Sequence, residues 1–447
     1  MGREILSQHN CDYGKDLVGT FIESRGGVAR KRFILLAALA CLAGYIYVYS
    51  SGRVDSPIRS DAFSYYIYLP SWLLFHDPSL QAVANDCCGG SFPSWTAINR
   101  GPHSWWVNSH PIGEAILIAP FFLVAHGLTR WSNLSPAGFS LYYLHAAGLA
   151  GLCYAVLGLW FLQRLLRRHF TSGVAGATLA AMLTGTSLFH YATFDSAWSH
   201  AFSFALCAAF LERLDAWRPS RPADAPIIGA ISGLLVLVRH TNAVIPACFL
   251  VATFLARTDT GLRARIRLLL VAFLIALIVV LPQLWLYRAA TGHFLVNAYG
   301  DRGFTFASPH VADVLFSVQK GLFFYAPVLT FGVAGLLAPP PSLRSWRWPS
   351  VAVLAIVTWL AASWWDWQFG ASFGHRGFVD VYPIFALGMA AAFSRLAARP
   401  PARLATAVTV TTLCALSMFQ MLQYWHGVLP AADLTWQGYR DVFLRMW

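Results

Sequence analysis

Long apolar runs recur from one end of this chain to the other, and they restrict its fold more than any other feature. The runs are about 15 to 22 residues long, the length that crosses a hydrocarbon core as a helix. Of the 447 residues, 57% are hydrophobic and only 12% are charged, so a water-soluble globule is excluded. No strand-like alternation competes, and in lipid a helix satisfies its own backbone. The sequence therefore predicts an all-α polytopic membrane protein.

Eleven of these runs are predicted to span the membrane, within a range of about 10 to 13. They cover residues 33–50, 138–163, 173–191, 197–212, 227–238, 243–256, 268–288, 321–338, 350–363, 379–394 and 404–423. Six loops placed inside carry 21 of the 32 Lys and Arg residues in fewer than 90 positions. These loops are 1–32, 164–172, 213–226, 257–267, 339–349 and 395–403. This bias is typical of cytoplasmic loops, and it predicts an inner N-terminus and an outer C-terminus.

Three parts of the chain follow from this topology. Residues 1–32 form a polar cytoplasmic segment that ends in a basic run and precedes a retained signal anchor. Residues 33–423 form the transmembrane domain, with large outer loops at 51–137 and 289–319. Residues 424–447 form a polar tail on the outer side.

Two apolar segments are predicted not to be ordinary spans. Residues 112–127 would put three arginines on the wrong side if they crossed, so we expect a helix along the outer interface. Residues 226–256 must enter and return within about thirty residues, and each arm of ~20 Å is shorter than a ~30 Å core. The tip of this hairpin, Arg239 to Asn242, is therefore expected at membrane depth, where polar groups usually mark a site.

The outer side collects the polar residues that are able to carry chemistry. They are Asp61, His110, Asp195, His200, Arg239, His240, Asn242, Lys320, Asp366, His375 and Arg376. That compartment supplies no nucleotide sugar, so a group transfer there must draw an activated substrate from the membrane. A sugar on a polyprenyl phosphate fits, because it needs cations for the leaving phosphate and a carboxylate for the acceptor hydroxyl.

Five sequence blocks carry a resemblance to a known family. They are "DAFSYYIYLPSWLLFHDPSL" (61–80), "NSHPIGEAILIAPFFLVAHGL" (108–128), "VRHTNAVIP" (238–246), "QKGLFFYAPVLTFGVAGLL" (319–337) and "WWDWQFGASFGHRGFVDVYPIFALG" (364–388). In this order they resemble the bacterial GT-C glycosyltransferases of the protein mannosyltransferase and aminoarabinose transferase group. The resemblance covers roughly residues 33–425 and implies a GT-C type bundle.

The resemblance implies roles for two positions near the first outer loop. Asp61, after the first span, corresponds to the catalytic base of the family. His110, ahead of Pro111, corresponds to a position where relatives often carry a Lys. Several relatives bind a divalent metal through a second acid, but here only Asp55 and Asp77 lie near and neither makes a D-x-D pattern. A metal-independent enzyme without a cofactor is therefore favoured, with a divalent metal as the alternative.

The remaining candidate residues divide by role. The proposed phosphate-binding residues are Arg376, Arg239, Lys320, His375 and His110, because they are cations or neutral donors at the outer ends of spans. The proposed residues lining the sugar and acceptor positions are Tyr65, Tyr66, His200, Asn242, Asp366 and Trp365, since aromatic faces pack on sugar rings.

Each candidate has a purely structural alternative. Asp61 alternatively caps a helix N-terminus, and Arg376 and Lys320 alternatively anchor span ends at the interface. The aromatic residues fit an interfacial belt equally well. Asp195 and His200 are expected to cap and line the start of span 197–212, and Asp380 to pair with Arg376 or another cation. A metal site formed with His190 is disfavoured because a fourth donor is lacking.

The cysteines do not predict a disulfide framework, because five of the eight fall inside apolar runs. Cys87 and Cys88 are adjacent in the first outer loop, where a disulfide to each other, a disulfide to a partner and two free thiols all stay open.

These observations predict an inverting glycosyltransferase on the periplasmic face of a bacterial inner membrane. It would move a sugar from a polyprenyl-phosphate donor to a hydroxyl of a glycan, lipid or protein. A transporter or flippase of a lipid-linked sugar is the rival, and a non-catalytic binding subunit is a third reading. Against transport, the sequence has no inverted repeat and its polar residues lie on one side. The sugar, the acceptor and the oligomeric state stay open.

Overall fold

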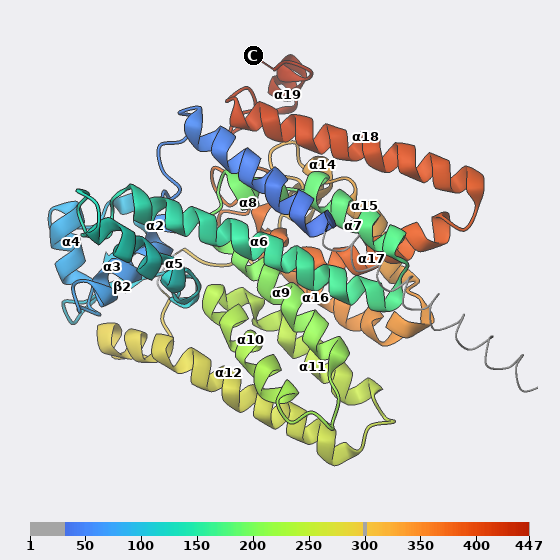
Figure 1. The fold of residues 1–447 in the computed structure, drawn as a ribbon, viewed down its shortest axis with the longest axis horizontal. Helices are drawn as coiled ribbons and strands as arrows, with labels where there is room; N and C mark the ends of the chain where they lie inside the picture. The colour runs from blue at the N-terminus through green and yellow to red at the C-terminus, as the bar shows by residue number, and fades with distance from the viewer. Residues whose placement is uncertain (1–31, 298–301, 447) are drawn as a thin grey trace, which may run out of the picture.

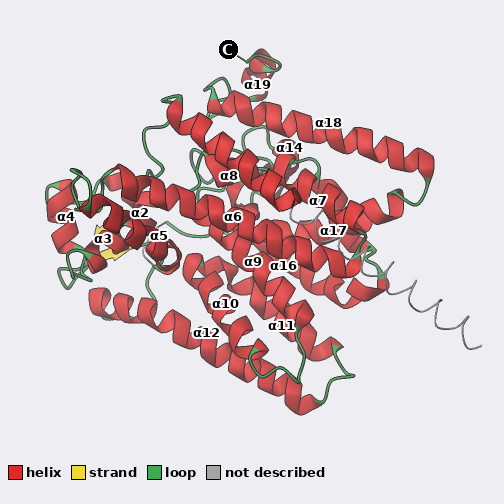
Figure 2. Cartoon of the chain, viewed as in Figure 1, coloured by secondary structure: helices red, strands yellow, loops and turns green. Residues whose placement is uncertain are grey.

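The computed structural model describes residues 32–297 and 302–446. The predicted cytoplasmic segment 1–32, apart from its last residue, lies outside the described residues, as do four residues of the loop 289–319. The described chain is mostly helical (Figure 2). Its one sheet within that part pairs β1 (Ile98–Arg100) with β2 (Trp106–Asn108), antiparallel and with Ile98 opposite Asn108.

The helices follow one another with few long interruptions. In chain order they are Arg32–Ser50, α2 (Asp61–Tyr66), α3 (Tyr68–Leu73), α4 (Gln81–Cys88), η1 (Ser94–Thr96), α5 (Gly113–Arg130), α6 (Leu141–His169), α7 (Ser172–Thr184), α8 (Leu188–Thr193), α9 (Ser199–Ala216), α10 (Asp224–Val238), η2 (His240–Ala243), α11 (Val244–Ala256), α12 (Leu262–Thr291), α13 (Val311–Phe316), α14 (Leu322–Tyr325), α15 (Leu329–Leu337), η3 (Pro341–Trp346), α16 (Arg347–Ser363), η4 (Arg376–Val381), α17 (Tyr382–Leu396), α18 (Pro400–Trp425) and α19 (Trp436–Val442).

Several helices are long and apolar enough to cross a membrane, as expected of an integral membrane protein. Five qualify among the described residues, namely Arg32–Ser50, Leu141–His169, Leu262–Thr291, Arg376–Leu396 and Pro400–Trp425. Each of the eleven predicted runs falls on helical residues, but two of them are broken. Run 173–191 is divided between α7 and α8, and run 321–338 between α14 and α15.

Helix pairs that are distant in sequence make the core of the bundle. Helix α6 packs on α9, α10 packs on α12, and α15 packs on α17. The last pair crosses so closely that a Cβ on Gly335 would lie 1.7 Å from the carbonyl oxygen of Gly388. Figure 1 shows α2 to α5 and the small sheet gathered at one end of the bundle, on the left of the view. Residues 51–137, which were predicted to be the first outer loop, therefore form a folded cap that packs on the helices.

A buried ion cluster lies in the segment of the bundle predicted to be cytoplasmic. The Glu212 carboxylate at the end of α9 is fully buried and lies 3.0 Å from Arg164 Nε of α6. Arg168 of the same helix also pairs with Glu212. The arginines that fixed the predicted topology are thus paired within the bundle, since a buried carboxylate needs a cation.

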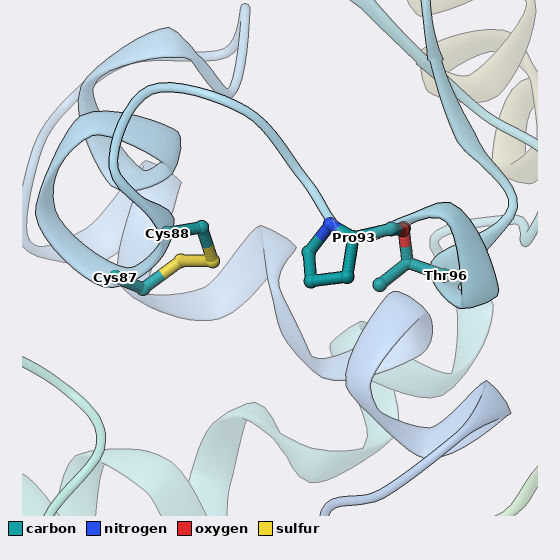
Figure 3. The surroundings of a disulfide bond; sticks show 4 residues. All are labelled: Cys87, Cys88, Pro93 and Thr96. Carbon is teal, nitrogen blue, oxygen red and sulfur yellow. A yellow bond between two sulfur atoms is a disulfide. The ribbon is translucent and has the colours of Figure 1, made fainter.

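Cys87 and Cys88 form a disulfide with each other at the C-terminal end of α4 (Figure 3). Of the three states left open by the sequence, the structure has this one. Figure 3 shows the disulfide together with Pro93 and Thr96, which lie on the stretch of chain that follows α4. The Thr96 carbonyl oxygen accepts a hydrogen bond from the Ser64 hydroxyl, so this segment is bonded to α2.

Candidate active site

A cavity of about 650 Å³ lies where this folded cap meets the bundle. Its walls come from α2, from the start of α9, from the tip between α10 and α11, and from residues 364–377. Nine predicted site residues line it, namely Asp61, Arg376, Arg239, His110, Tyr65, His200, Asn242, Asp366 and Trp365. Segments that are more than 300 residues apart in sequence therefore converge on one chamber.

Asp61 is the first residue of α2, and its side chain is 30% exposed. The N-cap is Ser60, whose side chain makes no capping hydrogen bond among the described residues. Asp61 is therefore not the cap that the structural alternative required. Ser60 has a φ of 51°, a left-handed conformation that an ordinary side chain disfavours. The chain turns sharply just before the carboxylate.

Arg376 is the cation that meets this carboxylate. Its Nη1 lies 2.9 Å from Asp61 Oδ2, and its guanidinium lies 4.5 Å from the centre of the Trp198 ring. Arg376 Nε donates no hydrogen bond to any described residue. Burial raises the pKa of Asp61, but Arg376 and the neighbouring cations outweigh it, so the pKa falls below its usual value. Asp61 is therefore ionised, and Arg376 keeps donor capacity for an anion.

Arg239 also lines the cavity, where it belongs to a small network of its own. Its Nε lies 3.5 Å from Asp380 Oδ2, and its Nη1 lies 3.1 Å from His200 Nδ1. The same His200 nitrogen is 3.2 Å from Asp380 Oδ1. Asp380 thus pairs with Arg239, and Arg376 remains available to Asp61. The hairpin tip predicted at membrane depth supplies this arginine and Asn242, which donates to the Ser203 hydroxyl at 3.0 Å.

His110 is next to Asp61 but is held in its neutral form. Its Nε2 lies 3.9 Å from Asp61 Oδ1, and its ring packs edge-on against Tyr65 with centroids 4.6 Å apart. Burial lowers the pKa of His110, and the opposing effect of Asp61 does not restore it. His110 therefore presents a neutral ring to the cavity and no positive charge.

Three predicted site residues are not brought to the cavity. Lys320 is buried and donates to the carbonyl oxygens of Ser372 and, at 2.7 Å, of Ala431. His375 is buried, and its Nε2 lies 3.0 Å from the Trp367 carbonyl oxygen. The Tyr66 hydroxyl donates to the Gly138 carbonyl oxygen. These side chains fix backbone segments around the chamber and do not face its interior.

One wall of the cavity is aromatic and includes residues that sequence reasoning missed. The backbone of Trp365 donates to the Gly303 carbonyl oxygen at 3.0 Å, which joins two segments in an antiparallel bridge. Trp365 is 45% exposed and faces Arg302, whose guanidinium is 4.6 Å from its ring centre. Trp198 and Phe369 also line the cavity, beneath Arg376. Arg302 lies in a loop whose fold the sequence pattern does not indicate.

Asp195 does not cap α9, since the N-cap there is Trp198. It pairs instead with Arg59, which sequence reasoning also missed, and with His190. The described residues include no cluster of three or more metal-ligating side chains. Of the two carboxylates that line the cavity, Asp61 has the Arg376 guanidinium beside it.

Comparison with known proteins supports the fold. No family model and no curated protein matches the sequence. Among solved structures, ArnT from Cupriavidus metallidurans bound to undecaprenyl phosphate matches with a TM-score of 0.55 and 15% identity. The match covers 89% of this chain and 65% of that one.

A second solved protein gives the same result. The Archaeoglobus fulgidus oligosaccharyltransferase in its apo form matches with a TM-score of 0.54 and 13% identity, over 94% of this chain and 60% of that one. Its complex with an inhibitory peptide and a dolichol-phosphate, named AglB, matches at 0.51 and 12%, also over 94% and 60%. The chain thus spans less than two thirds of each of these proteins. The chain therefore shares its fold with these two solved proteins.

Proposed function

We propose that this protein is a glycosyltransferase that moves a sugar from a polyprenyl phosphate to an acceptor hydroxyl. The observation that carries the proposal is the pairing of an ionised carboxylate, Asp61, with a buried arginine, Arg376, in one chamber. The solved structures with this fold add support, because two of them hold a polyprenyl phosphate or a dolichol-phosphate.

The reaction is a single displacement at the anomeric carbon of the donor. The acceptor oxygen attacks that carbon, and the Asp61 carboxylate takes the hydroxyl proton. The bond between the anomeric carbon and the phosphate oxygen breaks, and its electron pair leaves with the polyprenyl phosphate. Attack from the face opposite the leaving group inverts the configuration.

Donor binding and base strength are coupled in this arrangement. In the structure Arg376 faces Asp61, but the singly charged phosphodiester of the donor would compete for the same guanidinium. Once the phosphate takes Arg376, the arginine no longer stabilises the Asp61 carboxylate alone, and the pKa of Asp61 rises. Asp61 then becomes a stronger base only when a donor is present, which disfavours idle proton transfer.

The other cavity residues take supporting roles in the proposal. Arg239, from the hairpin tip, would share the phosphate charge, and His110 would donate a hydrogen bond to it. Trp365 and Tyr65 offer aromatic faces to a sugar ring. The reaction needs no metal in this scheme, because two guanidinium groups offset the charge that develops on the leaving oxygen.

The predicted topology is kept as part of the proposal. About eleven spans would place the cavity on the periplasmic side of a bacterial inner membrane, together with the tail 424–447. The acceptor would then be a cell-envelope glycan, lipid or protein.

The test is a turnover assay with purified protein and a panel of polyprenyl-phosphate sugars, with cell-envelope extract as the acceptor source. Release of free polyprenyl phosphate together with glycosylated product from one donor is the expected result. If a donor crosses the bilayer of a proteoliposome intact and is never cleaved, the transport reading replaces ours.

A further inference from the structure

A second ion pair involves a residue close in sequence to the candidate base. Arg59, two residues before Asp61, extends its guanidinium to Asp195 in the loop between α8 and α9. Arg59 Nη2 lies 2.5 Å from Asp195 Oδ1, and the Asp195 side chain is only 2% exposed. The guanidinium also lies 4.6 Å from the centre of the Phe194 ring. Burial would raise the pKa of Asp195, but Arg59 and His190 lower it to about 2.

The residues around this ion pair fix the orientation of the Asp195 carboxylate. The indole N–H of Trp425 donates to His190 Nδ1 at 2.9 Å, and an indole nitrogen is only a donor. His190 Nδ1 is therefore the acceptor and Nε2 carries the hydrogen, which it donates to Asp195 Oδ2 at 2.8 Å. Both Asp195 oxygens are thus engaged, and the carboxylate has one orientation.

The loop that carries Asp195 is itself held rigidly against α6. A Cβ on Gly151 would lie 1.6 Å from the Ser196 carbonyl oxygen, so this loop rests directly on the helix backbone. The Tyr49 hydroxyl also donates to the Phe194 carbonyl oxygen at 3.0 Å. Arg59 is therefore attached to a fixed point of the bundle and not to a mobile surface loop.

The backbone between Arg59 and Asp61 shows the effect of this attachment. Ser60, the residue between them, has a φ of 51° and a ψ of −130°, which a serine adopts only under constraint. With Arg59 directed to Asp195 on one side, this turn directs Asp61 to the other side, where Arg376 lies. An ion pair of this kind is a poor source of stability, because desolvation offsets most of the attraction.

We infer that Arg59 and Asp195 are positioning residues, whose ion pair holds the turn at Ser60 so that the Asp61 carboxylate faces Arg376 in the cavity. The inference rests on the proposed function, since it assigns these residues to the reaction of Asp61. Neither residue lines the cavity, so neither touches the substrate.

The test compares turnover, donor KM and pH profile of the wild type with Asp195→Asn, which keeps the shape and removes the charge. We expect kcat per folded molecule to fall at least tenfold while the donor KM changes less than threefold. The acid limb of kcat/KM should also move to higher pH. Asp61 is faced by Arg376, His110, His200 and Arg239, and it also interacts with Asp366, Glu114 and Tyr65. Its pKa rises when it moves away from Arg376.

A second variant separates positioning from stability. The double variant Arg59→Met/Asp195→Leu removes both charges and leaves no unpaired charge, so its Tm should be higher than that of Asp195→Asn. The kcat of this double variant should stay low. The matched control is Glu212→Gln, which breaks another ion pair at the far end of α9 and should lower Tm with kcat unchanged.

The outcomes are distinguishable. If the double variant turns over like the wild type with an unmoved pH profile, the ion pair only tethers the loop and the inference is wrong. If Glu212→Gln loses as much kcat as Asp195→Asn, the loss reflects general destabilisation and the inference is also wrong. If the wild type itself releases no polyprenyl phosphate from any donor, the proposed function fails first.

Discussion

Replacing Arg376 by alanine tests the phosphate site most sharply, because two effects are expected from one change. The guanidinium is 12% exposed and lies over Trp198, so its hydrogen bonds to a phosphate would be largely shielded from water. Charge-assisted hydrogen bonds contribute about 1.5 to 3 kcal/mol each. Loss of two costs about 3 kcal/mol or more, which lowers kcat/KM by roughly 100-fold or more.

The second effect falls on Asp61. Without Arg376 the carboxylate loses the cation 2.9 Å away, and the desolvation that raises the pKa of Asp61 is less opposed. The sign is fixed: a base with a higher pKa is protonated up to a higher pH, so the acid limb of kcat/KM moves upward. Arg376→Lys is the matched control. It keeps the charge but not the two-pronged geometry, and we expect an intermediate kcat/KM and a smaller shift.

The assay follows release of polyprenyl phosphate across a pH series, with binding of unlabelled polyprenyl phosphate measured in parallel. Arg376→Ala within threefold of the wild type in kcat/KM would refute the phosphate role. If kcat/KM of Arg376→Ala falls strongly but the acid limb of its pH profile does not move, the phosphate role is supported and the coupling between Arg376 and Asp61 is refuted.

Three further predictions concern Trp365, Lys320 and Gly335. Trp365→Ala should raise the donor KM about fivefold to tenfold with the acceptor KM unchanged, because a ring stacked on the donor sugar contributes about 1 kcal/mol. Equal changes in both KM values would argue against this stacking. Burial lowers the pKa of Lys320 from 10.5 to about 7, so between about pH 7 and pH 10.5 the unfolded chain binds more protons than the folded one. The free energy of unfolding should therefore rise with pH across this window, and Lys320→Met should flatten the rise in a series of thermal unfolding measurements. Gly335→Val should yield no folded protein on size-exclusion chromatography, because its Cβ would meet the Gly388 carbonyl oxygen, whereas Gly127→Val on an open face should fold normally.

Much of the fold was readable from the sequence because apolar length and arginine placement are local signals. The run 138–163 and the hairpin at 226–256 both appear as helices close to their expected bounds. The breaks within 173–191 and 321–338 were not predicted. The apolar composition continues across each break, and only the tertiary packing decides where the helix stops.

The candidate site, like the fold, was predicted only in part. Asp61 and Arg376 were predicted because each is an expensive charge beside an apolar run, and they meet in the cavity. Lys320 carries the same signal, but its partners are two backbone carbonyls, one of them 111 residues away. Arg59 was missed for a related reason, since Asp195 lies 136 residues further along the chain. Pairings of this kind depend on the fold and leave no mark in a single sequence.

The most direct measurement compares the wild type with Asp61→Asn for both donor binding and polyprenyl-phosphate release, using the same donor. The account predicts that the variant binds the donor within threefold of the wild-type Kd and releases at least a thousandfold less polyprenyl phosphate, because the amide no longer accepts the hydroxyl proton. An Asp61→Asn protein that turns over at the wild-type rate would contradict the account at its centre.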